Sequence, residues 1–501
     1  MESTAVSVFE EIIDSAGVAN RLEELLPKGV RGRQLKVRTL LLGILLALSD
    51  GRAAHLTRVH QALVALPDHE RRRLGITVGW KCGPHLLSYR QVERTFSLVA
   101  GVMAPRDPNA TDNLLQRFSD ELLEASVPAE HKDATDAYAV DWTDVESFAR
   151  PPLTEGGFTA DPDASWGHRR GDGPGQDHEL FFGYYLQLAT MVHEENSDAV
   201  AELVRRLLLA TCHTDPPRAF VPVLEDMAKA GVRLGDVLCD SGYSHRIAEH
   251  WALPLRALGA ELVMDLHPHD RGTQGTHHGA IRFNGSLYCP ATPVALFDIG
   301  PLSRGANDEQ TMAHDAKSAE LARYKLGRIS GDDEDGFYRV GCPAVKGKVR
   351  CPKRDSSMAL SLERPEILAP PEDAPLCCRQ ATITVPPDIN AKTRQKHDYP
   401  SKAHRLSYGR RSAAERSNST VKDPASNDIS RGWCRLMGVG AMTLMITCLF
   451  VTRNQRVLAS FEAREAEDRR RLATGLPPKT RKRRRRTIAD LVTASAHAPP
   501  H

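Results

Sequence analysis

The sequence lacks three features that would narrow its location or its chemistry. The N-terminus, MESTAVSVFEEIID, is acidic and has no hydrophobic segment typical of a signal peptide. The ten cysteines include no C-x2-C pair, so they favour reduced thiols in a cytoplasmic protein over a disulfide framework. The net charge is only +2 over 501 residues, so any affinity for nucleic acid must come from where the charges lie.

Hydrophobic runs long enough to span a membrane are also scarce. The run LMGVGAMTLMITCLFVT, residues 436–452, is at the short end for a span and is rich in glycine, threonine and other small residues. We interpret it as a buried helix of a large α/β core, with a membrane span as the alternative. We therefore expect no membrane partner.

The length predicts two to four domains, and the first 125 residues predict helices. Ser88 and Gln91 form a capping box ahead of an apolar helical face. Arginines such as Arg31, Arg33 and Arg38 lie beside turn residues in this region. Residues 1–125 are thus predicted to be a helical N-terminal DNA-binding domain, although a helical bundle without that function has the same pattern.

Strands and helices alternate from residue 126 to 266, which predicts a mixed α/β core with a partly parallel sheet. Strands are expected at AYAVDWT (137–143), FFGYYLQLATMV (181–192), VLC (237–239) and ELVMDL (261–266), and helices at VAELVRRLLLA (200–210) and AFVPVLEDMAKAG (219–231). A loop rich in Gly, Asp, His and Arg is expected at 161–177, between the first two strands. Asp141 and Asp240 stand near the carboxyl ends of their strands, where ligands gather in such sheets.

Residues 267–400 predict a β-rich insertion, because short β-like pieces alternate with glycine, proline and charge. Its cysteines are Cys289, Cys342, Cys351, Cys377 and Cys378. They could bind zinc, but adjacent cysteines are awkward tetrahedral ligands, so structural thiols are favoured.

Four histidines and a basic tail also invite a binding role. His267, His269, His277 and His278 resemble a metal cluster, but they lack fixed spacing, which favours a loop near DNA. Residues 401–460 are expected to complete the core with helices, and 461–501 form a basic, partly disordered tail. Its RKRRRR stretch (481–486) either contacts phosphates or only keeps the tail solvated.

The most informative stretch is YGRRSAAERSNSTVKDP, residues 408–424. Read as one helix, it places Tyr408, Arg411, Glu415 and Lys422 within about 60° of arc. A solvated polar surface is one interpretation of such a face. The other is a site, in which Glu415 joins Asp141 and Asp240 as an acidic triad for two Mg²⁺ or Mn²⁺ ions.

The spacing Tyr408-x2-Arg411-x3-Glu415-x6-Lys422 resembles the Tyr-Arg-Glu-Lys signature of a large group of DDE transposases from bacterial insertion sequences. The motifs VDWTDVES around Asp141 and LCDSGYS around Asp240 look like the first and second acidic motifs of that family. The resemblance covers roughly residues 85 to 460.

The resemblance implies a ribonuclease-H-like catalytic core, interrupted by the β-rich insertion and preceded by an all-helical N-terminal domain. It implies Mg²⁺- or Mn²⁺-dependent cleavage at the ends of a mobile element, by water and then by a freed 3′-hydroxyl that joins target DNA. Asp141, Asp240 and Glu415 would be the catalytic metal ligands, and Tyr408, Arg411 and Lys422 would bind DNA.

The resemblance also implies a homodimer or higher oligomer on DNA, in the cytoplasm and associated with the nucleoid. The first aspartate is the least certain position, since Asp133, Asp136, Asp144 and Glu146 crowd the same strand; Asp144 is the second choice. Two other functions stay open: a catalytically inactive DNA-binding relative, and a ribonuclease-H-like nuclease without strand transfer.

Overall fold

The computed structural model describes residues 5–27, 35–51, 53–80, 83–104, 113–154, 156–169, 179–303, 305–423, 428–432 and 434–479. The chain divides into two units, 1–455 and 456–501. Arg31, Arg33 and the RKRRRR stretch lie outside the described residues. Within the described part, no helix combines the length and the apolar character needed to cross a membrane.

The N-terminal region is helical and surrounds one hydrophobic helix. Its helices are α1 (Ala5–Ala16), α2 (Val18–Leu25), α3 (Val37–Ser49), α4 (Leu56–Val64), α5 (Asp68–Arg73), α6 (Tyr89–Met103), α7 (Leu114–Ala125) and α8 (Ala129–Lys132). Helix α3 is apolar on every side and almost wholly buried, as expected for a helix enclosed by others. The capping box is confirmed: the backbone N of Ser88 donates to Oε1 of Gln91 at 2.7 Å, at the start of α6.

The region is not all helical, however. Strands β1 (Thr77–Trp80) and β2 (Gly83–Leu86) form an antiparallel hairpin between α5 and α6. The β-branched run from Ile76 to Val78 favours this extended conformation. The expectation of helices alone before residue 125 is therefore wrong at this point.

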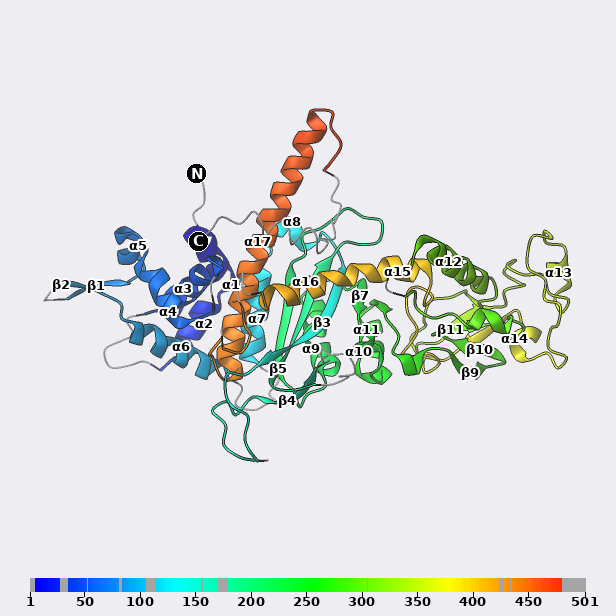
Figure 1. The fold of residues 1–501 in the computed structure, drawn as a ribbon, viewed down its shortest axis with the longest axis horizontal. Helices are drawn as coiled ribbons and strands as arrows, with labels where there is room; N and C mark the ends of the chain where they lie inside the picture. Colours follow the sequence, from blue (N-terminus) through cyan, green and yellow to red (C-terminus); the bar gives the residue numbers. More distant parts are fainter. Residues whose placement is uncertain are drawn as a thin grey trace, which may run out of the picture. The chain divides into compact units, whose positions relative to one another are not determined.

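The core is a six-stranded mixed sheet (Figure 1). Its strands are β3 (Ala137–Glu146), β4 (Ser165–Arg169), β5 (Glu179–Val192), β6 (Val204–Thr211), β7 (Asp236–Cys239) and β8 (Glu261–Met264). Strand β5 lies antiparallel between β3 on one edge and β4 and β6 on the other. Strand β7 runs parallel to both β3 and β8. The predicted partly parallel sheet is confirmed.

Two local predictions in the core are wrong. VAELVRRLLLA was expected to be a helix, but its second half is strand β6, because a short apolar run satisfies either pattern. Arg205 and Arg206 are buried in this strand and both contact Glu124. The expected loop at 161–177 contains strand β4.

Helices cover the sheet and carry the rest of the core. They are α9 (Pro216–Lys229), α10 (Ser241–Ser244), η1 (Ala248–His250), α11 (Ala252–Ala257), α15 (Lys402–Tyr408), η4 (Gly409–Arg411), α16 (Ser412–Val421) and α17 (Val439–Ala473). Figure 1 shows α16 crossing the strands of the sheet. Ala413 and Ala414 of α16 are fully buried against Ala139 and Leu238, because side chains this small let helix and sheet approach closely.

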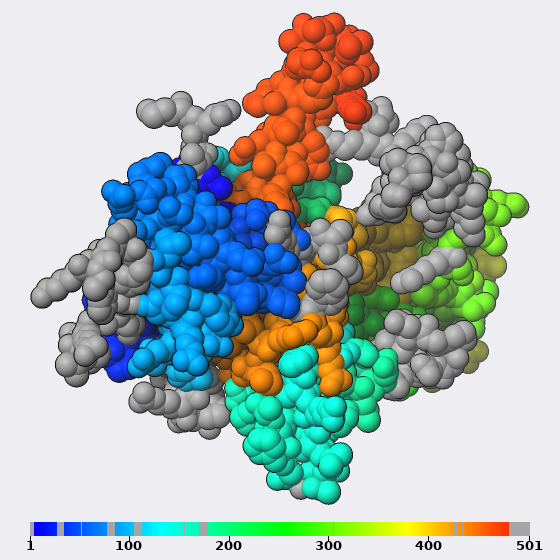
Figure 2. All heavy atoms as spheres, turned by 60° about the vertical axis from the view of Figure 1, so that its left-hand side comes forward, coloured from blue at the N-terminus to red at the C-terminus, as the bar shows by residue number. Residues whose placement is uncertain are grey.

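The apolar run 436–452 is a buried helix, as predicted. Helix α17 begins at Val439, and Leu444, Ile446 and Phe450 have no exposed surface. In Figure 2 the light-blue residues of α6 lie against the orange residues that lead into α17. Asn454 is also buried. Its Oδ1 accepts from the backbone N of Val204 and its Nδ2 donates to the carbonyl O of Val204, each at 2.9 Å, so these two backbone groups of β6 are hydrogen-bonded at the edge of the sheet.

The insertion contains two small antiparallel sheets. One holds β9 (Thr273–His277), β10 (Ala280–Phe283) and β11 (Ser286–Tyr288), and the other β12 (Gly327–Arg328), β13 (Tyr338–Gly341) and β14 (Thr382–Val385). Helical pieces are η2 (Pro268–Asp270), η3 (Val294–Phe297), α12 (Asp308–Arg323), α13 (Asp355–Met358) and α14 (Leu376–Arg379). The strands are short and irregular chain separates them, so "β-rich" overstates the strand content of the described residues.

The insertion begins directly after strand β8 and ends beside the same strand. The backbone N of Lys396 donates to the carbonyl O of Leu262 at 2.9 Å. The side chain of Gln395 accepts from the backbone N of Met264 at 2.7 Å. The chain therefore leaves the core after β8 and rejoins it beside the same strand.

Candidate functional site

Asp141 and Asp240 occupy matching positions on neighbouring parallel strands. In the register of β3 and β7, Ala139 lies opposite Leu238, and each aspartate follows two residues later. Because side chains alternate along a strand, both carboxylates emerge on the face that Ala139 and Leu238 share with α16. Strand β3 itself continues to Glu146 against β5, so Asp141 is in mid-strand rather than near its end. Only the parallel pairing of β3 with β7 ends before Asp141.

The two carboxylates are buried close to each other, and this is reflected in their pKa values. Burial, reinforced by the charge of Asp240, raises the pKa of Asp141 to about 7, against the opposing effect of Arg411. Burial also raises the pKa of Asp240, although Arg411 and the backbone N–H groups of Gly242 and Tyr243 oppose it. Two acids held in this way need a cation or a proton.

Arg411 supplies part of that positive charge in the structure. Its guanidinium lies 3.5 Å from Asp141 and forms an ion pair with Glu415, one turn along the helix. The backbone here is not one continuous helix as predicted: α15 ends at Tyr408, a 3₁₀ turn spans Gly409–Arg411, and α16 starts at Ser412. Nevertheless, Arg411 and Glu415 both face the aspartates.

Asn418 is a member of this site that the sequence interpretation missed. Its Nδ2 donates to Oδ2 of Asp141 at 3.2 Å, while its buried Oδ1 has no hydrogen-bond partner among the described residues. Asn418 follows Glu415 by three residues, so helical periodicity was the signal that could have found it.

Lys422 lies apart from the other signature residues. Its Nζ donates to Oδ1 of Asp144 at 2.9 Å, and Arg169 reaches the other oxygen at 3.2 Å. Although burial opposes it, these two cations hold the pKa of Asp144 below its usual range. Asp144, the alternative first aspartate, is thus already neutralised by Lys422 and Arg169. These three side chains line a cavity of about 300 Å³ together with Glu146.

Tyr408 and an aromatic stack complete the surroundings. The Tyr408 ring lies parallel to His404 at 5.6 Å, and the Arg411 guanidinium sits 5.5 Å from its centre. The ring of Trp142, next to Asp141, packs against Tyr243, with the two ring centres 4.6 Å apart. A side chain at Gly242 would come within 2.3 Å of Trp142, so the turn after Asp240 requires glycine there.

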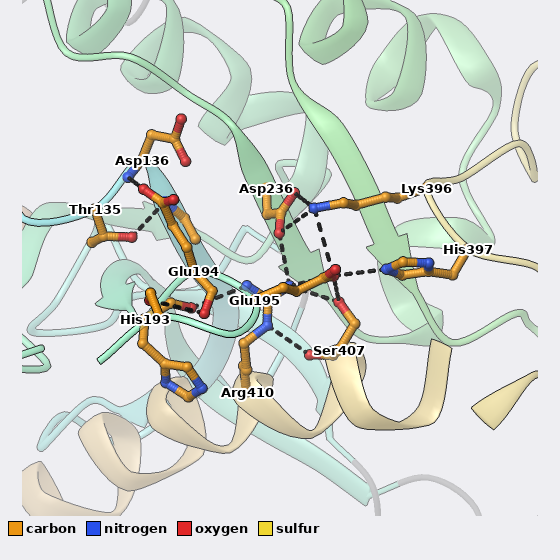
Figure 3. A network of polar contacts seen from close by, with 12 residues as sticks. Thr135, Asp136, His193, Glu194, Glu195, Asp236, Lys396, His397, Ser407 and Arg410 are labelled. Carbon is orange, nitrogen blue, oxygen red and sulfur yellow. Dashed lines mark hydrogen bonds and ion pairs between the residues drawn. The ribbon is translucent and has the colours of Figure 1, made fainter. Parts of the chain in front are cut away.

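A buried polar network anchors the segment before Arg411 (Figure 3). Arg410, almost fully buried, donates to Asp236 at 2.8 Å and to Glu195 at 3.2 Å. Lys396, at the end of the insertion, donates to the same Asp236 at 2.7 Å. Although burial raises the pKa of Glu195, hydrogen bonds from Ser407 and His397 outweigh it and bring it to about 2. This network fixes the backbone that presents Arg411.

The structure therefore brings Asp141, Asp240, Arg411 and Glu415 together and places Lys422 on Asp144. The Glu415 side chain is 55% exposed and turned to Arg411. Within the described part of the chain, one group of three or more His, Cys, Asp or Glu residues is arranged to hold a metal ion. It is His245, His267 and His269, with one ligand atom from each residue and all three atoms within 4.8 Å of one another. The three acids are thus near each other but do not converge as tightly as a filled metal site.

Neither protein-family models nor curated proteins yield a match to this chain.

Proposed function

We propose that this chain is a DDE transposase of a bacterial insertion sequence, which binds element ends and catalyses metal-dependent strand cleavage and strand transfer. One observation carries the proposal: Asp141 and Asp240 emerge side by side from adjacent parallel strands, beneath the helix that bears Arg411 and Glu415. Together with the Tyr408-to-Lys422 spacing, this is the arrangement that such an enzyme needs.

The topology of the sheet supports a ribonuclease-H-like core. Strands β3, β5 and β6 are antiparallel and consecutive apart from the short β4, and β7 and β8 follow on the other side of β3, parallel to it. Three antiparallel strands followed by two parallel ones, with the first strand in the centre, is what that fold requires. The insertion leaves after β8 and returns before Glu415, as the resemblance implies.

The donor set fits a hard divalent cation. Asp141, Asp240 and Glu415 offer only oxygen, which Mg²⁺ and Mn²⁺ prefer. The raised pKa values of both aspartates and the unpartnered oxygen of Asn418 support a missing positive charge at this point. Bound there, the cations would stabilise charge on the attacking and leaving oxygens of a phosphodiester.

The remaining side chains suit a DNA backbone. The guanidinium of Arg411 can bind a phosphate bidentately, and Lys422 can meet one as a point charge. Both cations are paired with carboxylates in the structure, so DNA phosphates compete with Glu415 and Asp144 for them. Tyr408 offers a ring and a hydroxyl beside Arg411.

The test is cleavage and joining of DNA that carries the element's own ends. We expect Mg²⁺-dependent nicks and joined products from the wild type, and loss of both in Asp141→Asn, Asp240→Asn and Glu415→Gln, with end binding retained. Asp226→Asn is the matched control, because Asp226 is exposed on α9 and pairs only with Lys229 among the described residues.

The outcomes separate the candidate functions. End binding without any Mg²⁺-dependent cleavage by the wild type would make the chain an inactive DNA-binding relative. Nicks without joined products would make it a nuclease. Near wild-type cleavage by any one of the three variants would remove that residue from the triad.

A further inference from the structure

Three histidines from two separate loops meet at the carboxyl edge of β7 and β8. His245 follows α10, and His267 and His269 follow β8. One ring nitrogen from each can be chosen so that all three lie within 4.8 Å of one another. The ring centres of His245 and His267 are 4.0 Å apart, and those of His267 and His269 are 4.8 Å apart. This group differs from the four histidines that resembled a metal cluster in the sequence, where a loop near DNA was favoured: His277 and His278 lie against each other, and His245 joins His267 and His269.

The loops that carry the histidines are held in place by hydrogen bonds. Ser244, the residue before His245, donates from Oγ to the carbonyl O of Asp265 at 2.8 Å and accepts from the backbone N of His267 at 3.0 Å. The backbone N of His269 lies 3.3 Å from Nδ1 of His267, which orients that ring. The cluster is therefore built from two fixed backbones rather than from free side chains.

An acidic side chain, paired with a lysine, also lies near these histidines. Asp270, next to His269, has one carboxylate oxygen that is buried and has no hydrogen-bond partner within the described residues. Its other oxygen pairs with Lys392 at 2.8 Å, and Lys392 also donates to the carbonyl O of His245 at 3.3 Å.

We propose that His245, His267 and His269 bind one divalent transition metal of the zinc class, at a site separate from the carboxylates of Asp141 and Asp240. Imidazole nitrogen suits Zn²⁺, Ni²⁺ and Co²⁺, whereas Mg²⁺ prefers oxygen. Three histidines leave one tetrahedral position for water.

The position of the site gives the metal a structural role. It joins the loop after Asp240 to the first residues of the insertion, where Lys392 brings in the insertion's last part. A metal at this point cross-links the loop that carries His245 to the loop that carries His267 and His269. A metal that binds the folded chain and not the unfolded chain stabilises the fold by mass action.

The experiment uses the full chain without a histidine tag, stripped with chelator and titrated with Zn²⁺ or Co²⁺. We expect one metal per chain, visible Co²⁺ bands without the strong near-ultraviolet absorption of thiolate ligation, and a higher Tm with Zn²⁺. Excess Mg²⁺ should not displace the metal. In His267→Ala the affinity should fall by more than about 100-fold, beyond the loss caused by removing an outer hydrogen-bond partner.

His278→Asn is the matched control. It removes one histidine outside the cluster, and asparagine tolerates the positive φ of 50° at that position. It should bind metal like the wild type, and circular dichroism checks that every variant is folded. The proposal is overturned by a wild type that takes up no stoichiometric Zn²⁺, by a folded His267→Ala that binds as tightly, or by thiolate bands that assign the metal to the cysteines of the insertion.

Discussion

Replacing Asp141 by asparagine should stabilise the metal-free protein at alkaline pH. The pKa of this carboxyl rises from the ordinary 3.8 to about 7, chiefly because it is buried. One pKa unit corresponds to about 1.4 kcal/mol, so a difference of about 3 makes ionisation in the folded state cost about 4 kcal/mol. The asparagine side chain keeps the shape of the aspartate without that cost.

The sign and the pH window follow from proton linkage. Between pH 3.8 and 7 the folded chain holds a proton that the unfolded chain releases, so the free energy of unfolding falls as pH rises. The loss is complete above about pH 7. The free energy of unfolding of Asp141→Asn should therefore equal that of the wild type at about pH 4 and exceed it by up to about 4 kcal/mol at about pH 8.

The assay is urea unfolding in EDTA at several pH values, followed by tryptophan fluorescence. Asp226→Asn, a change at an exposed carboxylate, should alter stability by less than about 0.5 kcal/mol at every pH. A gain for Asp141→Asn that is the same at both ends of this pH range would contradict the reasoning, as would no gain at the alkaline end. The variant that loses cleavage would thus be the more stable protein, as expected where function requires crowded charge.

Two further substitutions test the packing around the site. Arg410→Ala should destabilise the fold by about 3 kcal/mol, because it leaves the buried Asp236 and the half-buried Glu195 with fewer partners. A loss below about 1 kcal/mol in urea unfolding would show the network to be dispensable. Gly440→Ala should lower the Tm, because its Cβ would lie 2.4 Å from a backbone oxygen of α6, at a cost of about 1–3 kcal/mol. Gly101→Ala, with no atom within 4 Å of the new Cβ, is the control, and an equal drop in Tm for both would refute the argument.

Patterns within one segment were predictable from the sequence. The 3.6-residue period and the capping box locate α6, alternation locates β3, and a run of apolar and aromatic residues locates β5. The exception is β6, where apolar residues around two arginines fit a helix as well as a strand. Its partner Glu124 lies far away in the sequence, so no local pattern could decide between them.

Relations between distant segments were not predictable. The spacing from Tyr408 to Lys422 anticipates that Arg411 and Glu415 share a face, but not that Arg411 lies against Asp141 or that Lys422 pairs with Asp144. The choice of Asp141 over Asp144 depends on the register between β3 and β7, which is a tertiary property. His245 joins His267 and His269 for the same reason.

The double attachment of the insertion to β8 makes this long segment a replaceable module. Because Gln395 and Lys396 bind back to the strand that the chain has just left, the excursion ends close to where it begins. The insertion is therefore connected to the sheet in the same way as a single surface loop, whatever its length. Exchange of residues 271–391 for a short linker should leave the strand order intact, so this part can change its size or its binding partner without altering the positions of the acids.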